Sequence, residues 1–139
     1  MSMFQIFNIS GSAVSAQSQR LNVVASNLAN VDTVAGPDGA AYKARQVMFQ
    51  THLMGANGQL DEASAGVKVT QITEDQTPGR RVFDPKHPKA DGTGYVTYSN
   101  VNSVEEMVNM ISASRSYQNN VEVMNTAKNL LQKTLQMGQ

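Results

Sequence analysis

Apolar side chains recur every seven residues along residues 103–135, and this spacing restricts the fold of the chain more than any other feature. No Gly or Pro interrupts the stretch, so it can form one continuous helix. Two rows alternate at offsets of three and four, the a/d pattern of a coiled-coil seam. The large apolar members of these rows are Met107, Met110, Tyr117, Val121, Met124, Leu131 and Leu135.

Side chains at the start of this stretch add to the pattern. Val104 and Ile111 widen the apolar stripe. Ser103, followed three residues later by Glu106, predicts a capping box that begins the helix. A stripe of this length needs a partner in a coiled coil or bundle, and the alternative is a core helix of a globular domain.

A second, weaker heptad pattern lies near the start of the chain. Phe7, Val14, Leu21 and Leu28 recur every seven residues, and Arg20 is the only charged residue between positions 2 and 31. Two heptad-patterned helices at opposite ends of one chain predict that they pack on each other, which brings the two termini to one end of the molecule. We therefore expect residues 1–31 and 101–139 to form one helical domain.

The region between the helices, residues 32–100, differs in composition. It contains all four Pro and eight of the ten Gly. These helix-breaking residues are too closely spaced for a long helix to form. Short β-branched or alternating stretches at residues 45–50, 67–73 and 94–98 predict strands, and residues 55–66 predict a polar loop. The expected fold class is α+β, with long terminal helices packed as a coiled-coil or bundle layer and a small, irregular, β-rich middle.

The composition excludes several classes of function. The formal net charge is zero, which gives no electrostatic basis for binding nucleic acid. There is no Cys, and no apolar run approaches the roughly 18–20 residues of a membrane span. The first residues lack the basic and apolar segments of a secretory signal, so we expect a cytoplasmic protein or one exported by another route.

No group of residues suggests catalysis or metal binding. His52 and His87 have no second ligand at zinc-type spacing. The run from Asp84 to Pro88 predicts a turn held by two prolines. We therefore expect no catalytic, cofactor or metal site.

Four stretches carry a resemblance to a known family. Ala29, Asn30 and Thr33 match the Ala-Asn-x-x-Thr signature of the bacterial flagellar rod and hook proteins. Residues 82–91, Gly94-Tyr95-Val96, and residues 100–117 resemble the proximal rod subunits of the C type, as does the short middle region. The signature positions in the middle of the chain are Asp84, Pro85, His87, Pro88, Gly94, Tyr95 and Val96.

The resemblance implies a structural axial subunit of the flagellar basal body. Such subunits are exported unfolded by the flagellar type III apparatus and stack helically with their own copies and other rod proteins. Their terminal helices form an inner tube around the export channel, and their β-rich middle faces outward. The rod crosses the periplasm and transmits torque, and further expected contacts are the MS ring of the motor and other hook–basal-body proteins.

Two other classes of function are weighed against this one. A soluble adaptor or export chaperone could use the Met-rich helix to bind a partner helix. An enzyme that cuts the cell wall would need separated carboxylates in a cleft, whereas the acidic pairs in this sequence are adjacent residues. If the chain is an axial subunit, the seam positions on both helices are the expected assembly surface.

Overall fold

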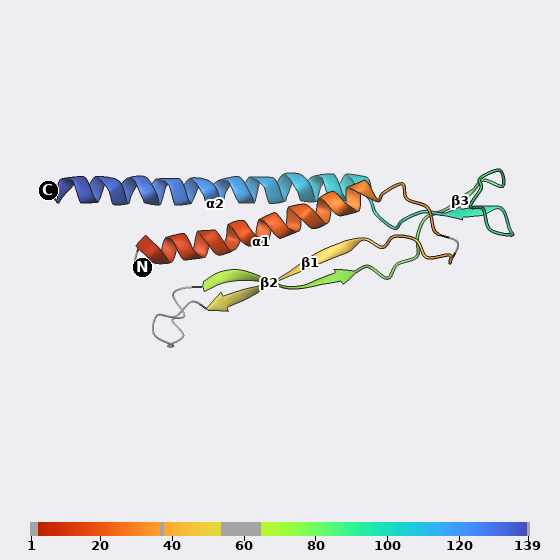
Figure 1. Ribbon diagram of the computed structural model, residues 1–139, viewed down its shortest axis with the longest axis horizontal. Coiled ribbons are helices and arrows are strands. Elements are labelled where there is room, and N and C mark those ends of the chain that lie inside the picture. Colours follow the sequence, from red (N-terminus) through yellow and green to blue (C-terminus); the bar gives the residue numbers. More distant parts are fainter. Residues whose placement is uncertain (1–2, 37, 54–64, 139) are drawn as a thin grey trace.

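The computed structural model describes residues 3–36, 38–53 and 65–138 (Figure 1). The elements follow one another as α1 (Met3–Ala29), β1 (Arg45–Leu53), β2 (Ala65–Glu74), β3 (Arg81–Phe83), β4 (Tyr95–Thr97) and α2 (Ser103–Met137). The predicted α+β fold, with two long terminal helices packed together and small antiparallel hairpins between them, is confirmed.

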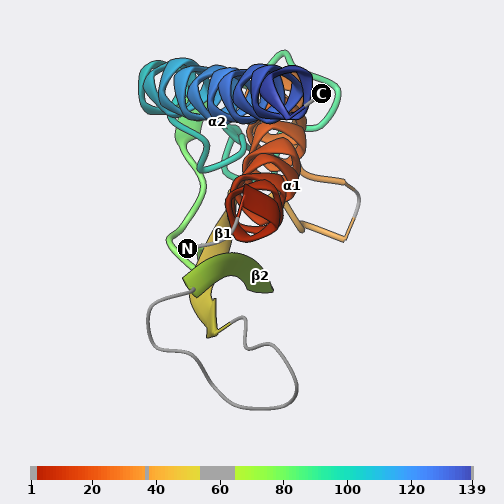
Figure 2. The same ribbon diagram turned by 90° about the vertical axis from the view of Figure 1, so that its left-hand side faces the viewer.

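The molecule has three layers, and α1 is the middle one. Figures 1 and 2 show α2 along one side of α1 and the β1–β2 hairpin along the other. This position explains why α1 has several buried residues, among them Ala16, Val23, Val24 and Asn27. Because α1 lies between two other layers, it contributes more buried residues than α2.

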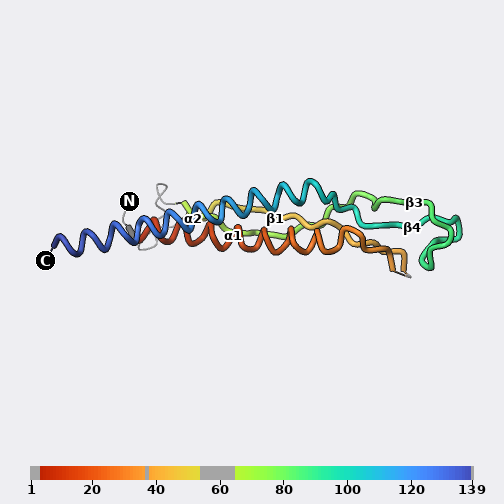
Figure 3. The backbone as a smooth tube through the Cα atoms, turned by 90° about the horizontal axis from the view of Figure 1, so that it is seen from above, coloured from red at the N-terminus to blue at the C-terminus, as the bar shows by residue number. Residues whose placement is uncertain are grey.

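The two helices run antiparallel and meet through small side chains. Ala113 and Ala127 are the buried apolar residues of α2, and Ala16 is buried on α1. Small residues allow the helix axes to approach closely. The outer ends of both helices lie at one end of the molecule, as expected, and α2 continues beyond the start of α1 (Figures 1 and 3).

The start of α2 differs from the predicted capping box. The N-cap is Asn102, whose side-chain oxygen accepts hydrogen bonds from the backbone amides of Val104 and Glu105. Ser103 is already helical, so the prediction that it caps the helix is wrong. Asn is as good an N-cap as Ser, and here it stands one residue earlier.

The β1–β2 hairpin is antiparallel, with Arg45 opposite Glu74 at its open end and a register shift between Met48 and Phe49. Both predicted strands are present, and β1 extends three residues further than expected. The polar loop expected at residues 55–66 lies, apart from Ala65 and Gly66, outside the described residues.

The second hairpin, β3–β4, lies beyond the far end of the helices. The predicted strand at residues 94–98 is present as β4, and Tyr98 adds an isolated bridge to Val34. Strand β3 has three exposed residues, and the sequence pattern did not reveal it. Val96 of β4 is completely buried and is the largest apolar side chain that the described structure encloses fully.

Candidate assembly surfaces and the helix–hairpin junction

Asn27, in the last turns of α1, fixes the start of β1. Its side-chain amide donates to the carbonyl of Arg45 at 2.8 Å, and its side-chain oxygen accepts from the Arg45 backbone N–H at 2.9 Å. The same oxygen accepts from the Tyr42 hydroxyl at 3.0 Å. The fully buried side chain thus pairs with the backbone as a neighbouring strand would.

Asn100 lies at the same junction, where the helices meet the β1–β2 hairpin, and binds it from the other side. Its side-chain oxygen accepts from the Ala44 amide at 2.7 Å, and its amide donates to the carbonyls of Asp75 and Thr77. The neighbouring Ser99 hydroxyl donates to the Val31 carbonyl at 2.7 Å. The chain entering α2 is therefore tied both to the end of α1 and to the ends of the hairpin strands. Sequence reasoning missed both asparagines, because nothing local distinguishes a buried asparagine from an exposed one.

The residues that follow α1 form hydrogen bonds that end the helix. The Asn30 amide donates back to the Ser26 carbonyl at 2.8 Å, and the Thr33 hydroxyl donates to the Asn30 carbonyl at 2.8 Å. These bonds satisfy carbonyls that the ended helix leaves free. The prediction that α1 ends at this segment and the chain turns away is confirmed, since the helix stops at Ala29.

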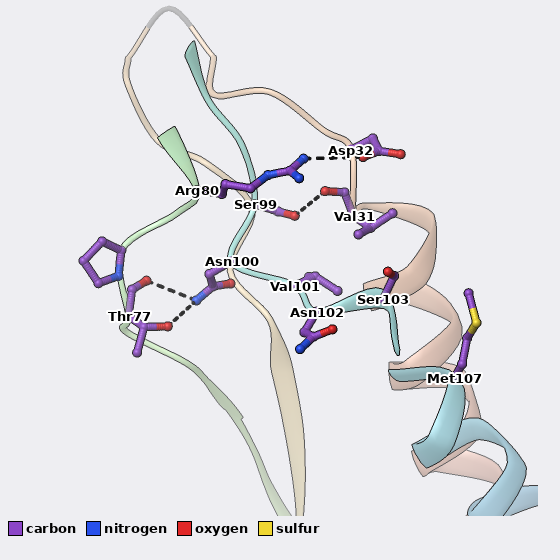
Figure 4. A pocket seen from close by; sticks show the side chains of 11 residues that line it. Val31, Asp32, Thr77, Arg80, Ser99, Asn100, Val101, Asn102, Ser103 and Met107 are labelled. Carbon is purple, nitrogen blue, oxygen red and sulfur yellow. Dashed lines mark hydrogen bonds and ion pairs between the residues drawn. The ribbon is translucent and has the colours of Figure 1, made fainter. Parts of the chain in front are cut away.

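A polar cavity of about 670 Å³ opens beside this junction (Figure 4). Asp32 and Arg80 face each other across it at 3.9 Å, with both side chains largely exposed. Met107 and Val101 form part of its apolar wall. An exposed ion pair of this kind contributes little energy.

The signature residues at the tip form a compact turn. The His87 backbone N–H donates to the Asp84 carbonyl, and the Lys86 N–H donates to the Asp84 carboxylate. Pro85 and Pro88 lie in this exposed turn, as predicted. Gly94 has φ +80°, and a Cβ at this position would lie 3.0 Å from the Phe83 ring, so the turn requires glycine.

Asp91 closes the tip of the β3–β4 hairpin. Its carboxylate accepts from the Thr93 hydroxyl and from the amides of Thr93 and Tyr95, and the Arg81 guanidinium lies 2.9 Å away. Led by the Thr93 hydroxyl, these donors lower the pKa of Asp91 to about 2. The signature Tyr95 packs edge-on against Phe83, with 5.2 Å between ring centres.

Glu106 is buried where α2 meets α1, with 8% of its surface exposed. Burial raises the pKa of its carboxyl group, as does the neighbouring Glu105, whereas a hydrogen bond from Asn27 and the charge of Arg20 lower it. One carboxylate oxygen has no hydrogen-bond partner. Nearby, Arg20 donates to the Asn109 side chain at 3.0 Å and links the two helices.

The predicted assembly seam is only partly covered. On α1, the side chains of Phe7, Val14, Leu21 and Leu28 are half-buried. On α2, the half-buried members are Met110, Val121, Met124 and Leu131, and the exposed members are Met107, Tyr117 and Leu135. The structure thus leaves much of this surface open, and its role in assembly stays a prediction.

A separate apolar patch occupies the first turns of α2. It consists of Val104, Met107, Val108 and Ile111, which are 54–68% exposed. Their spacing of three, four and seven places them along one side of the helix, opposite Glu106 and Ala113. Val104 and Ile111, expected to widen the seam, therefore face away from α1. We call these four residues the N-terminal patch of α2.

A groove and an overhang follow toward the other end of α2. Ile6 of α1 and Val123, Ala127 and Leu130 of α2 line a mainly apolar groove of about 450 Å³. Leu130 is the last α2 residue in this groove, and Figures 1 and 3 show α2 continuing beyond α1. We call residues 131–137 the overhang.

The part of the chain that the structure describes contains no cluster of three or more His, Asp or Glu side chains that could hold a metal ion. Within the same residues, neither helix combines the length and apolar character needed to cross a membrane.

Comparisons with known proteins place the chain in a family. Residues 7–37 match the family model described as flagella basal body rod protein, and residues 93–137 match the one described as flagellar basal body rod FlgEFG protein C-terminal. Three relatives are flagellar basal-body rod proteins FlgC: 57% identical in Yersinia enterocolitica, and 55% identical in Escherichia coli O6:H1 and in Salmonella typhimurium. Each match covers the whole of both chains. The chain belongs to the FlgC family of flagellar basal-body rod proteins.

Proposed function

We propose that this chain assembles helically with its own copies and with other rod proteins into the proximal part of the flagellar rod, a tube that carries torque and encloses the export channel. Membership in the FlgC family makes it a structural component of the basal-body rod and not an enzyme.

The observation that carries the proposal is the amount of surface that the single chain leaves exposed. Its accessible surface is 9570 Å². This is roughly a third more than the ~7,000 Å² typical of a compact monomer of its mass. Among the residues that the structure describes, seventeen large apolar side chains are exposed, nine of them on α2. Neighbouring subunits on several faces would cover such a surface, and an open helical arrangement supplies them.

The layers suggest how the chain is oriented in the tube. We propose that residues 1–31 and 101–139 form the inner helical domain and that residues 32–100 form the outer region. This assignment is supported by the hairpin β1–β2, which lies on the side of α1 away from α2. The predicted seam, from Phe7 to Leu28 on α1 and from Met107 to Leu135 on α2, would then contact neighbouring helices.

The remaining partners follow from the same family. We propose export through the flagellar type III apparatus and a position in the part of the rod that crosses the periplasm, with contacts to the MS ring and to other hook–basal-body proteins. A small core made mainly of Ala and Val is compatible with unfolding before export. A chaperone or adaptor role would instead require a stable free chain that does not remain in the finished rod.

Leu131→Asp tests the assembly role of the seam. The change places a carboxylate on the half-buried row of α2, at a cost of several kcal/mol if a neighbouring helix covers it. Cells that carry the variant as their only copy should contain the protein but yield no basal bodies with complete rods, and they should not swim.

Asn129→Asp, at an exposed position outside the overhang and the apolar groove, is the matched control and should support normal swimming. Normal rods in the Leu131→Asp strain would show that this row is not an assembly surface. Absence of the wild-type chain from purified basal bodies would contradict the proposed function itself.

A further inference from the structure

The edge of β1 that faces away from β2 is open. In an antiparallel pair, every second residue of a strand directs its backbone N–H and C=O groups away from the partner strand. Arg45 is such a residue, because the Asn27 side chain accepts from its N–H and donates to its carbonyl. The register shift inserts Thr70 into β2 and not into β1, so Val47 and Phe49 share the outward direction of Arg45. Within the part of the chain that the structure describes, no group outside the hairpin forms a hydrogen bond with the backbone of Val47 or Phe49.

A cavity of about 430 Å³ lies along this edge, between the hairpin and the two helices. Val47 and Phe49 line it on the side of β1. Arg20 of α1 and Glu105 and Asn109 of α2 line it on the side of the helices. Most of the lining side chains are polar or charged, so the cavity suits a segment that brings hydrogen-bonding groups of its own.

The contact between Asn27 and Arg45 shows what kind of group this edge binds. The Asn27 amide makes the same two hydrogen bonds that a residue of a third strand would make with Arg45. The edge groups of Val47 and Phe49 continue the same row. An α-helix cannot pair with such a row, because its backbone groups are already bonded within the helix. An open strand edge binds an extended segment, which adds to the sheet as a further strand.

Glu105 indicates the charge of the segment that fits. The two guanidinium groups in the cavity already have partners, since Arg45 lies 3.4 Å from Glu74 and Arg20 donates to Asn109. Glu105 is exposed, and among the described residues it has no ion pair within 4.0 Å. A Lys or Arg on the bound segment would complement this carboxylate.

We propose that the free edge of β1 binds an extended segment of an adjacent rod subunit as a third strand, with a basic side chain of that segment beside Glu105. The inference rests on the proposed function and adds to it a contact of the hairpin region. The edge recognises its partner mainly through the backbone, so rod subunits of different sequence can occupy it.

Photocrosslinking in assembled basal bodies tests this contact. The full chain carries p-benzoylphenylalanine in place of Phe49, an aromatic residue that lines the cavity and is 40% exposed. It is expressed as the only copy, basal bodies are purified after irradiation, and the crosslinked peptides are identified by mass spectrometry. We expect a crosslink to a rod subunit, in a segment outside that subunit's two terminal helices. The same probe in place of Phe83, which is exposed on β3 away from the cavity, is the control and should not yield this peptide.

Val47→Pro tests the backbone pairing in the chain that carries the Phe49 probe. The change removes one N–H at the free edge and no hydrogen bond within the hairpin. It should lower the yield of the crosslink several-fold, as expected for the loss of one hydrogen bond. Ile72→Pro is the matched control, because Ile72 lies opposite Val47 and directs its N–H to the other edge of the hairpin. Ile72→Pro should retain the crosslink, and so should Val47→Thr, which keeps the N–H.

Glu105→Gln tests the charge of the segment and should also lower the yield several-fold. Glu122→Gln, at an exposed position of α2 that does not line this cavity, is its control and should leave the yield unchanged. Equal yields from these two variants would reject the basic side chain in the proposal.

A crosslink from Phe49 to a terminal helix of a rod subunit, a crosslink to a protein outside the rod, or no crosslink in assembled rods would overturn the inference. An unchanged yield in Val47→Pro would overturn it as well. If neither proline variant assembles, the Phe49 crosslink decides alone, and a probe in place of Gln46, which also lines the cavity, replaces a Phe49 probe that prevents assembly. These outcomes leave the proposed function intact as long as the chain is present in the purified basal bodies. Absence of the probe-free chain from those basal bodies would instead reject the proposed function.

Discussion

Glu106 is the only acidic side chain that the described structure buries, and it lies in the contact between the helices. The neighbouring residues do not fully satisfy the hydrogen-bonding capacity of its carboxylate, because one oxygen has no hydrogen-bond partner. A buried, incompletely paired carboxylate costs stability when it is charged. Its position at the helix contact is compatible with a role in fixing the register of α2 on α1, together with the hydrogen bond from Arg20 to Asn109.

We predict that Glu106→Gln stabilises the free chain near neutral pH, on the order of 1 kcal/mol, because the buried charge is removed while an acceptor for Asn27 remains. Burial raises the pKa of Glu106 in the folded chain. Its protonated form therefore favours folding below the ordinary pKa of glutamate, and this contribution is lost as the pH rises through the folded pKa.

Denaturant unfolding across this pH range measures the effect. The wild-type free energy of unfolding should fall with rising pH more than that of Glu106→Gln, and Glu105→Gln, at an exposed position, is the control. Parallel pH profiles for the wild type and Glu106→Gln would contradict the prediction.

At the scale of elements, the segment from Ala29 to Thr33 separates the helix layer from the hairpins. Asn30 bonds back to Ser26, and Thr33 bonds back to Asn30, so two side chains replace the hydrogen bonds that a continued helix would make. Ser99 then ties Val31 to the strand that leads into α2. These bonds hold the segment from which the chain leaves the helix layer.

Asn30→Ala should extend α1 and misdirect the chain, because alanine favours helix and cannot donate to the Ser26 carbonyl. We expect fewer completed rods and reduced swimming, with normal amounts of the protein in the cell. Asn22→Ala, an equal gain in helix propensity at an exposed position within α1, is the control. Equal swimming of the two strains would show that the junction has no special role.

The same elements show what could be read from sequence and what could not. The span of α2 was predictable because no breaker interrupts it, and the end of α1 because Asn30, Asp32 and Thr33 compete with helix. The side of α2 that meets α1 was harder to identify. Heptad counting favours large apolar residues, whereas close helix contact selects Ala113 and Ala127. Asn27 and Asn100 depend on partners 18 and 56 residues away, which local patterns do not contain.

At the scale of the whole molecule, the thin layered shape limits stability. The buried apolar residues among those described are only Ala and Val, which contribute less burial than Leu, Ile or Phe. Burying a large apolar side chain contributes about 1.5–3 kcal/mol, and ordering one residue costs about 1–2 kcal/mol in backbone entropy alone. The larger apolar side chains of α2 lie on its surface, where only a neighbouring subunit can bury them.

We therefore predict that both terminal helices are weakly protected from amide exchange in the free chain and strongly protected in the rod. The largest gains should lie in the N-terminal patch of α2 and in its overhang, since both are apolar surfaces that the chain leaves open. Hydrogen exchange with mass spectrometry on the purified chain and on isolated basal bodies measures the difference, with the denatured chain as the reference for unprotected exchange. Strong protection of α1 and α2 in the free chain, equal to that in the rod, would show that the helix pair is stable by itself. Assembly would then be the docking of subunits that are already folded. The exposed apolar stripe on α2 would contribute contacts to neighbouring subunits without being needed to order the helices.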